Sequence, residues 1–465
     1  MPVSVARRIA FDVLLRVETQ GAFADELLFV RLAEPKLKRE DAALATELVM
    51  GVLRWQRLLD FLVGQQLESS AAKRGAKPSA GKRDPARLDP EVRIALRLGL
   101  YQLRWLSRIP ARAAVHESVE LVKRARKSSA ASLVNAVLRN APQQPTEALM
   151  PANLPPADRL AILHSHPTWL VEHWLRTVGA DQTSALLEAN NAPPRITCAV
   201  ASRESVDALA RELASEGVHT APVRWLHEAI EVTGGSVSRT RAFREGRVRI
   251  QDEASQMIAL LLDVHLGMKV LDLCAAPGGK TLILAEHAGS DGVIVASDLH
   301  LHRLRVMRER MLSVVQRVDF VALDAEQTLP YRGAFDRILV DVPCSGTGTL
   351  ARNPEIRWRL QPADLLDLRQ RQQAILGNAV ATLRPGGRLV YSTCSLEPEE
   401  NERVVEAVLS RDPELSLISD AAAVLAPYLR PGAEATQLFD AHGYFRTRPH
   451  PHGTDGFFAA VLQRR

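Results

Sequence analysis

Cysteine is scarce in this sequence. Four cysteines occur among 465 residues, at Cys198, Cys274, Cys344 and Cys394. They are too few and too scattered for a disulfide scaffold, and none lies in the C-x-x-C spacing of a zinc site. The sequence therefore predicts a protein of the reducing cytoplasm that holds no metal.

Long apolar runs are missing as well. No segment approaches the length of a membrane span, and the N-terminus lacks the apolar stretch of a signal peptide. Hydrophobic residues make up 46% and charged residues 24% of the chain, as in soluble globular proteins. A chain of this length exceeds one ordinary core, so we expect two or three domains and no membrane partner.

Positive charge is concentrated in the first third of the chain. Residues 1–150 hold 25 Lys and Arg against 16 Asp and Glu, whereas the remainder holds 34 against 38. This asymmetry favours a surface that meets a polyanion such as a nucleic acid, with a merely solvated basic surface as the alternative. The basic stretch 69–87 is expected to be a flexible loop that either contacts RNA phosphates or is a solvated insertion.

Apolar residues in the first 140 positions recur at helical spacing. Ile9, Val13 and Val17 form one such face, and the same period predicts helices over 42–62, 92–106, 113–126 and 131–139. A Pro-rich stretch at 141–156 then indicates a linker. Helices over 166–190 are followed by a short strand–helix–strand run at 195–200, 206–216 and 223 with 230–232. This run is too small to bury a core alone, so we expect it to pack on the C-terminal part of the chain.

From about Val248 the sequence alternates between apolar strands and amphipathic helices. Strands are predicted at 269–274, 292–298, 318–324, 335–342, 387–393 and 457–462, and helices at 279–287, 301–315, 362–383 and 398–409. This alternation is typical of an α/β Rossmann-like fold with a mostly parallel, doubly wound sheet, whose ligands bind outside the carboxyl ends of the strands.

A cofactor site is expected at these strand ends. The segment DLCAAPGGKT, residues 272–281, is typical of a strand, a tight glycine turn and a helix start that a ligand can approach closely. The following strands end near Asp298, Asp324 and Asp341, which suit ribose hydroxyls, an adenine amino group and a positively charged tail. This set favours S-adenosylmethionine, although each aspartate alone could cap a helix. A phosphate-binding loop would need glycine at Cys274, which disfavours an NTPase.

Two thiols are expected at the same edge. Cys344 in DVPCSGTG (341–348) and Cys394 in YSTCS (391–395) each follow an apolar run. Carbon 5 of a pyrimidine is a weak nucleophile until a thiolate adds to carbon 6, so the pair favours covalent methyl transfer over two merely buried cysteines. The attacking thiol must be partly ionised, and Lys280 and a bound sulfonium are the candidate positive charges. This chemistry leaves open which thiol attacks.

These motifs, with RIQDEASQ (249–256) and HGTDGFF (452–458), resemble those of RNA 5-methylcytosine methyltransferases in the ribosomal RNA small-subunit methyltransferase B (Sun/Fmu) family. ARRIA (6–10), GLYQL (99–103) and LVNAVLR (133–139) resemble a NusB-type RNA-binding domain, a pairing that favours rRNA over tRNA. The resemblance implies a NusB-like all-α domain at 1–145, a small helical and α+β domain at 157–240 and a catalytic domain at 241–465.

The resemblance also implies an activity and a set of site residues. The activity is transfer of a methyl group from S-adenosylmethionine to carbon 5 of a cytosine in 16S rRNA, through a covalent cysteine adduct. Cys394 would be the nucleophile, Cys344 would assist release, Asp341 would contact the cytosine edge, and Lys280 completes our set of catalytic candidates. The implied cofactor-binding residues are Cys274, Ala275, Ala276, Pro277, Gly278, Gly279, Lys280, Asp298, Asp324 and Asp341.

We expect a monomer whose partner is small-subunit rRNA. A tRNA cytosine methyltransferase and a non-catalytic NusB-like RNA-binding factor are the alternative functions. Among the remaining residues, we expect Cys198 to be a core residue and His450 and His452 not to bind a metal, since no further ligands accompany them. Arg352 and Asn353 either contact the RNA or belong to a plain loop.

Overall fold

The structure is a computed structural model that describes residues 3–32, 34, 37–72, 84–142, 144–201, 204–311 and 318–465. Most of the predicted basic loop at 69–87 therefore lies outside the described residues. The chain forms two compact units, which we call the helical unit (Met1–Ala192 with Leu350–Arg359) and the catalytic unit (Pro193–Thr349 with Leu360–Arg465). The domain boundaries at 145 and 240 stay a prediction.

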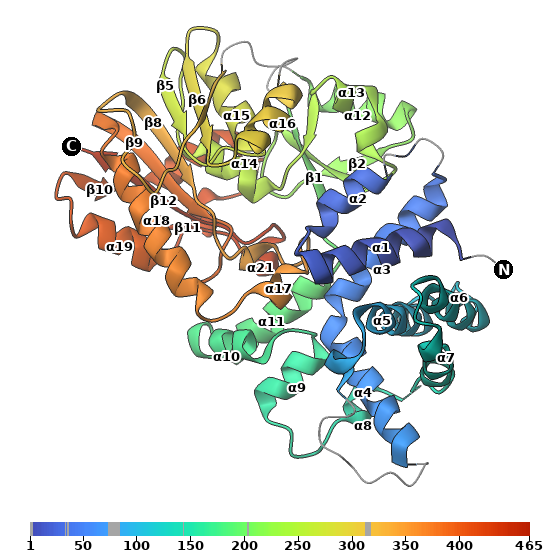
Figure 1. Ribbon diagram of the computed structural model, residues 1–465. Coiled ribbons are helices and arrows are strands. Elements are labelled where there is room, and N and C mark those ends of the chain that lie inside the picture. Colours follow the sequence, from blue (N-terminus) through green and yellow to red (C-terminus); the bar gives the residue numbers. More distant parts are fainter. Residues whose placement is uncertain are drawn as a thin grey trace. The chain divides into compact units, whose positions relative to one another are not determined.

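The helical unit consists of helices throughout its described part (Figure 1). They are α1 (Val5–Gln20), α2 (Ala24–Leu32), α3 (Arg39–Arg54), α4 (Gln56–Ala72), α5 (Pro90–Trp105), α6 (Ala111–Arg124), α7 (Ala131–Arg139), α8 (Thr146–Leu149), α9 (Pro156–Leu163), α10 (Thr168–Thr177), α11 (Ala180–Asn191) and the short α17 (Ile356–Arg359). The single helix predicted over 42–62 is divided, because the backbone at Trp55 turns to φ −103° and ψ 19°. Leu48 and Leu59 on either side of this break still face one core, which explains why the apolar period continued across it.

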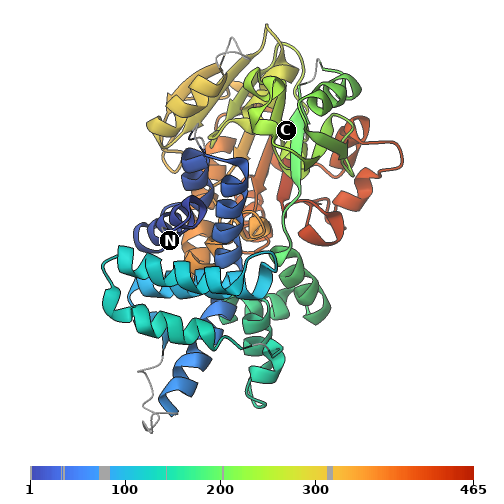
Figure 2. The same ribbon diagram turned by 90° about the vertical axis from the view of Figure 1, so that its right-hand side faces the viewer.

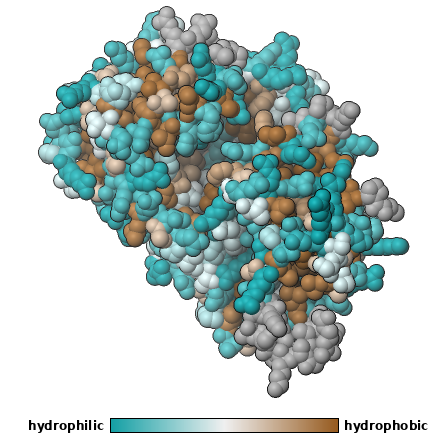
Figure 3. All heavy atoms as spheres, in the orientation of Figure 1, coloured by the Kyte–Doolittle hydropathy of each residue, from teal (hydrophilic) through white to brown (hydrophobic). Residues whose placement is uncertain are grey.

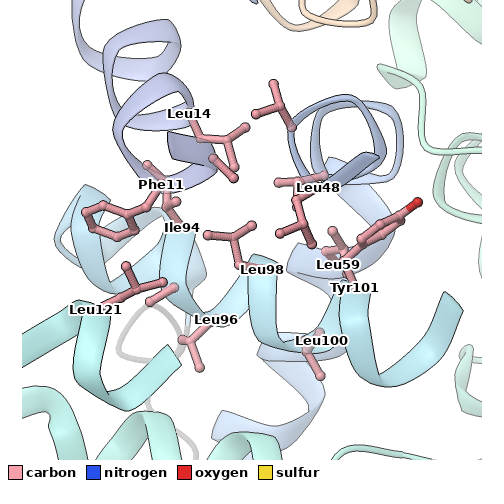
Figure 4. Close-up of a cluster of buried hydrophobic side chains, with 14 of the residues drawn as sticks. Phe11, Leu14, Leu48, Leu59, Ile94, Leu96, Leu98, Leu100, Tyr101 and Leu121 are labelled. Atoms are coloured by element: carbon pink, nitrogen blue, oxygen red, sulfur yellow. The ribbon is translucent and has the colours of Figure 1, made fainter. Parts of the chain in front are cut away.

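One hydrophobic core holds the helical unit together. Figure 4 shows side chains of several helices pointing toward one another. The labelled residues are Phe11, Leu14, Leu48, Leu59, Ile94, Leu96, Leu98, Leu100, Tyr101 and Leu121. Arg97, only 4% exposed, lies beside this core, and its guanidinium is paired with Glu18 and Asp60 at 2.7 Å each. Such pairing compensates the burial of the charge.

A segment that follows the Cys344 motif belongs to the helical unit rather than to its sequence neighbours. Arg357 is fully buried and donates to the backbone carbonyls of Ser165 and Asn190 at 3.1 Å each. The Trp358 indole donates to the carbonyl of Leu53 at 2.7 Å. The two terminal nitrogens of Arg357 donate to carbonyl oxygens, whereas its buried Nε has no hydrogen-bond partner in the described structure. Burial lowers the pKa of the guanidinium to about 9. No local pattern in the sequence indicated this docking.

The catalytic unit begins with a small antiparallel sheet. Its strands β1 (Ile196–Val200), β2 (His219–Pro222), β3 (Ala229–Gly234) and β4 (Val248–Ile250) lie in the order β2-β3-β1-β4, beside α12 (Val206–Ser215) and α13 (Arg241–Arg244). Contrary to expectation, this segment has a small core of its own, around Cys198, Leu209 and Leu213. Ala199 and Val223 are buried too, and Val223 with Trp225 joins the core of the larger sheet, as the packing prediction required.

The larger sheet of the catalytic unit confirms the predicted fold class. Its path is β10-β12-β9-β8-β5-β6-β7, with β11 paired to β12. The strands lie side by side in Figures 1 and 2: β5 (Lys269–Asp272), β6 (Val293–Asp298), β7 (Val318–Ala322), β8 (Phe335–Asp341), β9 (Leu383–Thr393), β10 (Leu415–Leu417), β11 (Phe445–Arg446) and β12 (Phe458–Arg464). Pairs from β7 to β9 are parallel, whereas β12 runs antiparallel to β9.

Helices cover both faces of this sheet. Leu339 and Val390 face α14 (Glu253–Leu260), α15 (Gly279–Ala288) and α20 (Ala421–Leu425), whereas Ile338 and Leu389 face α18 (Asp364–Val380) and α19 (Glu402–Leu409). The basic helix α16 (Leu301–Met311) packs beside β6 and β7, and α21 (Pro449–His452) precedes the last strand. Adjacent strand residues thus face opposite layers, as the pleat requires.

The surface is mixed in character. On the face seen in Figure 3, hydrophilic residues predominate and smaller hydrophobic patches lie between them. Within the described ranges, the helices are all too short or too polar to span a bilayer.

Gly51 of α3 provides a test of packing in the helical unit. A Cβ at Gly51 would lie 2.0 Å from Tyr101 Cζ, inside the core. We expect Gly51→Ala to lower the free energy of unfolding by about 1–3 kcal/mol through overpacking, although alanine favours a helix. Gly377→Ala in α18 is the matched control, since its Cβ meets nothing within 4 Å. It should raise stability by about 0.5–1 kcal/mol in urea unfolding of the intact protein.

Equal stabilisation by both substitutions would contradict the close packing of α3 against Tyr101.

Candidate functional site

The predicted site residues gather at the carboxyl ends of the parallel strands in the catalytic unit. The strand β5 lies between β6 and β8, so the strand order reverses beside it. Asp272, Asp298 and Asp341 are the last residues of β5, β6 and β8, and Cys394 directly follows β9. Such a reversal point is where open α/β sheets bind ligands.

The glycine turn after β5 leaves room for a ligand to reach the backbone. Gly278 has φ 105°, which favours glycine, and a Cβ there would lie 2.8 Å from Met307 Cγ. The next residue, Gly279, begins α15. A Cβ at Gly279 would lie 3.3 Å from Cδ and Oε1 of the Gln251 amide. The Gln251 Oε1 atom is buried and has no hydrogen-bond partner in the described structure. An unpaired buried acceptor over a helix N-terminus fits a polar ligand group.

Asp298, at the end of β6, and Asp324, two residues after β7, bind groups of the segments that follow them. Asp298 is 5% exposed and accepts from the backbone N–H of His300 at 3.0 Å and from Arg303 at 3.3 Å. Asp324 is exposed and accepts from the N–H of Glu326 at 2.9 Å. Both therefore accept hydrogen bonds from residues shortly after them in the sequence, whereas the alternative interpretation was that each caps a helix. Each carboxylate still has further lone pairs for a ligand.

Lys280 and Asp341 form an ion pair at the centre of the edge. Lys280 Nζ donates to Asp341 Oδ2 at 2.7 Å, and Ser392 Oγ donates to Asp341 Oδ1 at 2.7 Å. The ammonium also lies 5.2 Å from the ring centre of Phe457. Burial opposes the Lys280 charge, but Asp341 and then Cys394 outweigh it, so the pKa of Lys280 is raised. The lysine is therefore a fixed cation beside the cysteine pair.

Asp272 is the most deeply buried of the four aspartates at this edge. It is 1% exposed and accepts from Thr281 Oγ1 at 2.6 Å. Burial raises its pKa to about 7, against the opposing effects of Thr281 and Lys280. Neighbouring Cys274 is half-buried, and burial followed by the charge of Asp272 raises the pKa of its thiol. Cys274 therefore lacks the environment of a reactive thiolate.

The structure brings the two predicted thiols into contact. Cys344 Sγ and Cys394 Sγ are 3.3 Å apart, and both cysteines are free and half-buried. The hydrogen bond to Cys394, then burial, raises the pKa of the Cys344 thiol well above its usual range. The Cys344 thiol therefore holds its proton firmly in this arrangement. This arrangement can support a nucleophile and a proton-transfer group on one substrate.

Close backbone contacts fix the loops around the thiols. The Gly348 N–H donates to the carbonyl of Cys394 at 2.9 Å, and the Gly456 N–H donates to the carbonyl of Gly348 at 2.8 Å. A Cβ at Gly348 would lie 2.1 Å from the Gly456 carbonyl oxygen. The glycines of DVPCSGTG and HGTDGFF therefore permit three loops to meet at the cysteines.

Glu400 contacts both cysteine loops and was missed in the sequence. It is fully buried and accepts from the serine that follows each cysteine, Ser345 and Ser395. The repeated Cys-Ser pair was a signal that could have indicated a shared partner. The carboxylate itself lies in the acidic run EPEENE, 397–402, where nothing in the sequence distinguishes it from its neighbours.

The sequence also singled out Cys198, His450, His452, Arg352 and Asn353. Cys198 is fully buried in β1, opposite Ile230, so the core prediction is confirmed. His452 accepts from the N–H of Arg448 at 3.0 Å. Arg352 and Asn353 lie in the Leu350–Arg359 segment of the helical unit, and an RNA contact by either one stays a prediction.

Comparison with known proteins gives a match for most of the chain. Residues 259–463 match the family described as 16S rRNA methyltransferase RsmB/F. Residues 4–143 match the NusB family, and residues 166–238 match the RsmF/B-like ferredoxin-like domain.

Full-length relatives show the same likeness. A probable ribosomal RNA small subunit methyltransferase B of Bacillus subtilis (strain 168) is 32% identical over 474 residues and covers 100% of both chains. Ribosomal RNA small subunit methyltransferase B of Pseudomonas putida is 36% identical over 434 residues, which are 92% of this chain and 91% of that one. The crystal structure of PH0851 has a TM-score of 0.78 and 24% identity over the full length of both chains, so it shares the fold.

The buried Asp272 makes stability depend on pH. Its folded-state pKa of about 7 lies above the ordinary 3.8, so the folded protein binds the extra proton and loses stability as the pH rises from about 4 to about 7. We expect Asp272→Asn to remove this loss, so that near pH 8 the variant exceeds the wild type by up to about 4 kcal/mol. Near pH 4 the two should be alike in urea unfolding.

Asp291→Asn, at an exposed position before β6, should follow the wild-type profile. Parallel pH profiles for Asp272→Asn and the wild type would show that Asp272 does not bind this proton.

Proposed function

The chain belongs to the RsmB/F family of 16S rRNA methyltransferases, and we propose that it forms a covalent bond between Cys394 and the cytosine that it methylates at carbon 5. It is an S-adenosylmethionine-dependent rRNA cytosine methyltransferase. The observation that carries the covalent route is the 3.3 Å approach of two free thiols at the ligand edge of the sheet.

Cys394 attacks and Cys344 manages the proton. The Cys394 thiolate forms a bond to carbon 6, and the displaced electron pair makes carbon 5 nucleophilic enough to take a methyl group. Cys344 then takes the proton from carbon 5, the electrons of that bond restore the carbon 5–carbon 6 double bond, and Cys394 leaves as a thiolate. A methyl group replaces one proton of the base, and one proton reaches the solvent for each turnover.

The electrostatics of the pair support this division. While Cys394 is an anion, its hydrogen bond holds the pKa of the Cys344 thiol high. Once Cys394 is a thioether in the adduct, that largest contribution disappears and Cys344 ionises more easily. Cys344 therefore becomes a base only after attack, when a base is needed.

Residues of the glycine turn and its neighbours fit S-adenosylmethionine. Gly278 and Gly279 leave a cradle that a Cβ would fill, and the unpaired Gln251 Oε1 can accept from an amino group. Asp298 and Asp324 would hold the ribose and the adenine amino group. When bound, the cofactor supplies a methyl group on a positively charged sulfonium.

Asp341 orients the target base, and Lys280 holds the Asp341 carboxylate in place. Both Asp341 oxygens already accept one hydrogen bond, from Lys280 and Ser392, so the carboxylate has a fixed direction. A remaining lone pair can accept from the exocyclic amine of cytosine. Uracil has a carbonyl oxygen in place of that amine, so it would bring two acceptors together without a hydrogen bond, which supports cytosine as the substrate.

The helical unit supports binding of the RNA. Arg108, Arg112, Arg124 and Arg139 are exposed on it, in the part that matches the NusB family. Such charges bind phosphates without reading sequence. A target cytosine must leave its stack to reach the thiols, so a single-stranded or loop site is favoured.

Single cysteine variants separate attack from release. We expect Cys344→Ala, incubated with S-adenosylmethionine and unmodified small-subunit rRNA, to accumulate a protein–RNA adduct because release lacks its base. The adduct would migrate slowly on a denaturing gel and would be absent from the Cys344→Ala/Cys394→Ala double variant. Cys394→Ala alone should reduce methyl transfer by about 10³-fold or more, since the nucleophile is lost.

Cys198→Ala, a buried cysteine in the small sheet, is the matched control. Methyl transfer by Cys394→Ala would reassign the nucleophile. Transfer to tRNA but not rRNA would favour a tRNA methyltransferase, and RNA binding without any transfer would favour a non-catalytic factor.

Asp298 tests the cofactor site without turnover. We expect Asp298→Ala to weaken S-adenosylmethionine binding by about tenfold or more in calorimetry, since a buried acceptor for the ribose is lost. Asp319→Ala, exposed on neighbouring β7, should bind as the wild type does. Equal affinities for the two variants would remove Asp298 from the site.

A further inference from the structure

A single buried carboxylate joins the two loops that carry the thiols. Ser395 Oγ donates to Glu400 Oε2 at 2.5 Å, and Ser345 Oγ donates to the same oxygen. The two serine hydroxyls also lie 2.9 Å apart. Ser345 directly follows Cys344, and Ser395 directly follows Cys394. Glu400 therefore restrains the residue next to each cysteine.

The other oxygen of Glu400 fastens the Cys344 loop a second time. The backbone N–H of Ser345 donates to Glu400 Oε1 at 2.8 Å. Gln372 Nε2 donates to the same oxygen at 2.9 Å and to the carbonyl of Pro343 at 3.0 Å. The residues on both sides of Cys344 are thus held by one side-chain pair.

Glu400 is itself anchored to the sheet through its backbone. The hydroxyl of Tyr391, a fully buried residue of β9, donates to the carbonyl of Glu400 at 2.5 Å. The next residue, Asn401, donates to the carbonyl of Ser395 at 3.0 Å and accepts from Thr393 Oγ1 at 2.6 Å. The carboxylate therefore has little freedom to move away from the loops.

We propose that Glu400 is a positioning residue of the methyl transfer, which holds the Cys344 and Cys394 loops at the separation that lets both thiols act on one pyrimidine ring. This role rests on the proposed function of the two cysteines. Glu400 touches neither substrate nor cofactor, and it places the two cysteine loops through Ser345, Ser395 and Gln372.

Four donors converge on the two oxygens, which is the pattern expected for an ionised carboxylate. Burial raises the pKa of Glu400 above its usual value, although the hydrogen bonds from Ser345, Ser395 and Gln372 oppose this rise. Its negative charge adds to the effect of Cys394 and burial in raising the pKa of Cys344. Glu400 thus also helps to keep the proton on Cys344 while Cys394 is the anion.

Two substitutions separate charge from placement. Glu400→Gln keeps the shape and removes the charge, whereas Glu400→Asp keeps the charge and draws it back by one methylene. Glu253→Gln is the matched control, because Glu253 is 3% exposed and accepts from the N–H groups of Trp225 and Leu226, outside the cysteine loops.

The measurement is the pH dependence of Cys344 alkylation by iodoacetamide, followed by peptide mass spectrometry in a Cys394→Ala background. Removing Cys394 isolates the contribution of Glu400 to the Cys344 midpoint. The same Glu400 variants, with both cysteines present, are assayed for single-turnover methyl transfer to 16S rRNA and for S-adenosylmethionine affinity by calorimetry.

We expect Glu400→Gln to lower the alkylation midpoint of Cys344 by about one pH unit, since a buried negative charge is removed. Glu400→Asp should leave the midpoint in place and reduce the single-turnover rate by about tenfold or more, because the loops shift. The affinity for S-adenosylmethionine should stay within about twofold of the wild type for both variants. Glu253→Gln should reduce the free energy of unfolding and leave the midpoint and the transfer rate unchanged.

The role of Glu400 is overturned if Glu400→Gln leaves the midpoint unchanged and both variants transfer methyl groups at the wild-type rate. A loss of stability equal to that of Glu253→Gln, with neither readout moved, would likewise reduce Glu400 to a structural residue. Absence of methyl transfer by the wild type would refute the proposed function instead, and the alkylation midpoint would still report whether Glu400 acts on Cys344.

Discussion

The parallel pairing of β8 with β9 is the interaction on which the site depends. Asp341 lies opposite Ser392 in this register, so their side chains form a hydrogen bond. The loops after β8 and β9 therefore begin side by side. Cys394 is the first residue after β9, and Cys344 lies three residues after the end of β8. Their sulfur atoms therefore come within 3.3 Å of each other. A slip by one residue would turn each side chain to the opposite face, so burial of both faces protects the register.

Carboxylates outnumber cations at this edge, where Lys280 pairs with Asp341 and Arg303 with Asp298. Asp272, Asp298, Asp324 and Asp341 gather there, while Lys280 is bound to Asp341. One response of the protein is visible at Asp272, where burial raises the pKa to about 7 and so reduces the negative charge. A positively charged ligand would reduce the repulsion among these carboxylates, which is why a sulfonium fits this edge better than a phosphate.

Much of this arrangement could be predicted from the sequence, because strands buried on both faces are apolar and their ends carry the chemistry. The strands near 269, 293 and 335 and the glycine turn were placed from local pattern alone. The break at Trp55 could not be predicted, since Leu48 and Leu59 keep one apolar period across it. The role of Glu400 could not be predicted either. It depends on contacts with Ser345, which is 55 residues away in the sequence, and with Ser395, which the fold brings to the same carboxylate. Contacts of this kind are fixed by topology, which local spacing does not contain.

The chain connects the cysteine loop directly to the helical unit. Thr349 is the last residue of the catalytic unit before Leu350, which is only six residues after Cys344. The docked segment ends at Arg359, whose guanidinium donates to the carbonyl of Val17 at 3.4 Å, and the chain then returns to the catalytic unit. The buried Arg357 stabilises this docking, since its removal would leave the carbonyls of Ser165 and Asn190 without this donor. The unit proposed to bind RNA therefore includes the continuation of the loop that carries Cys344.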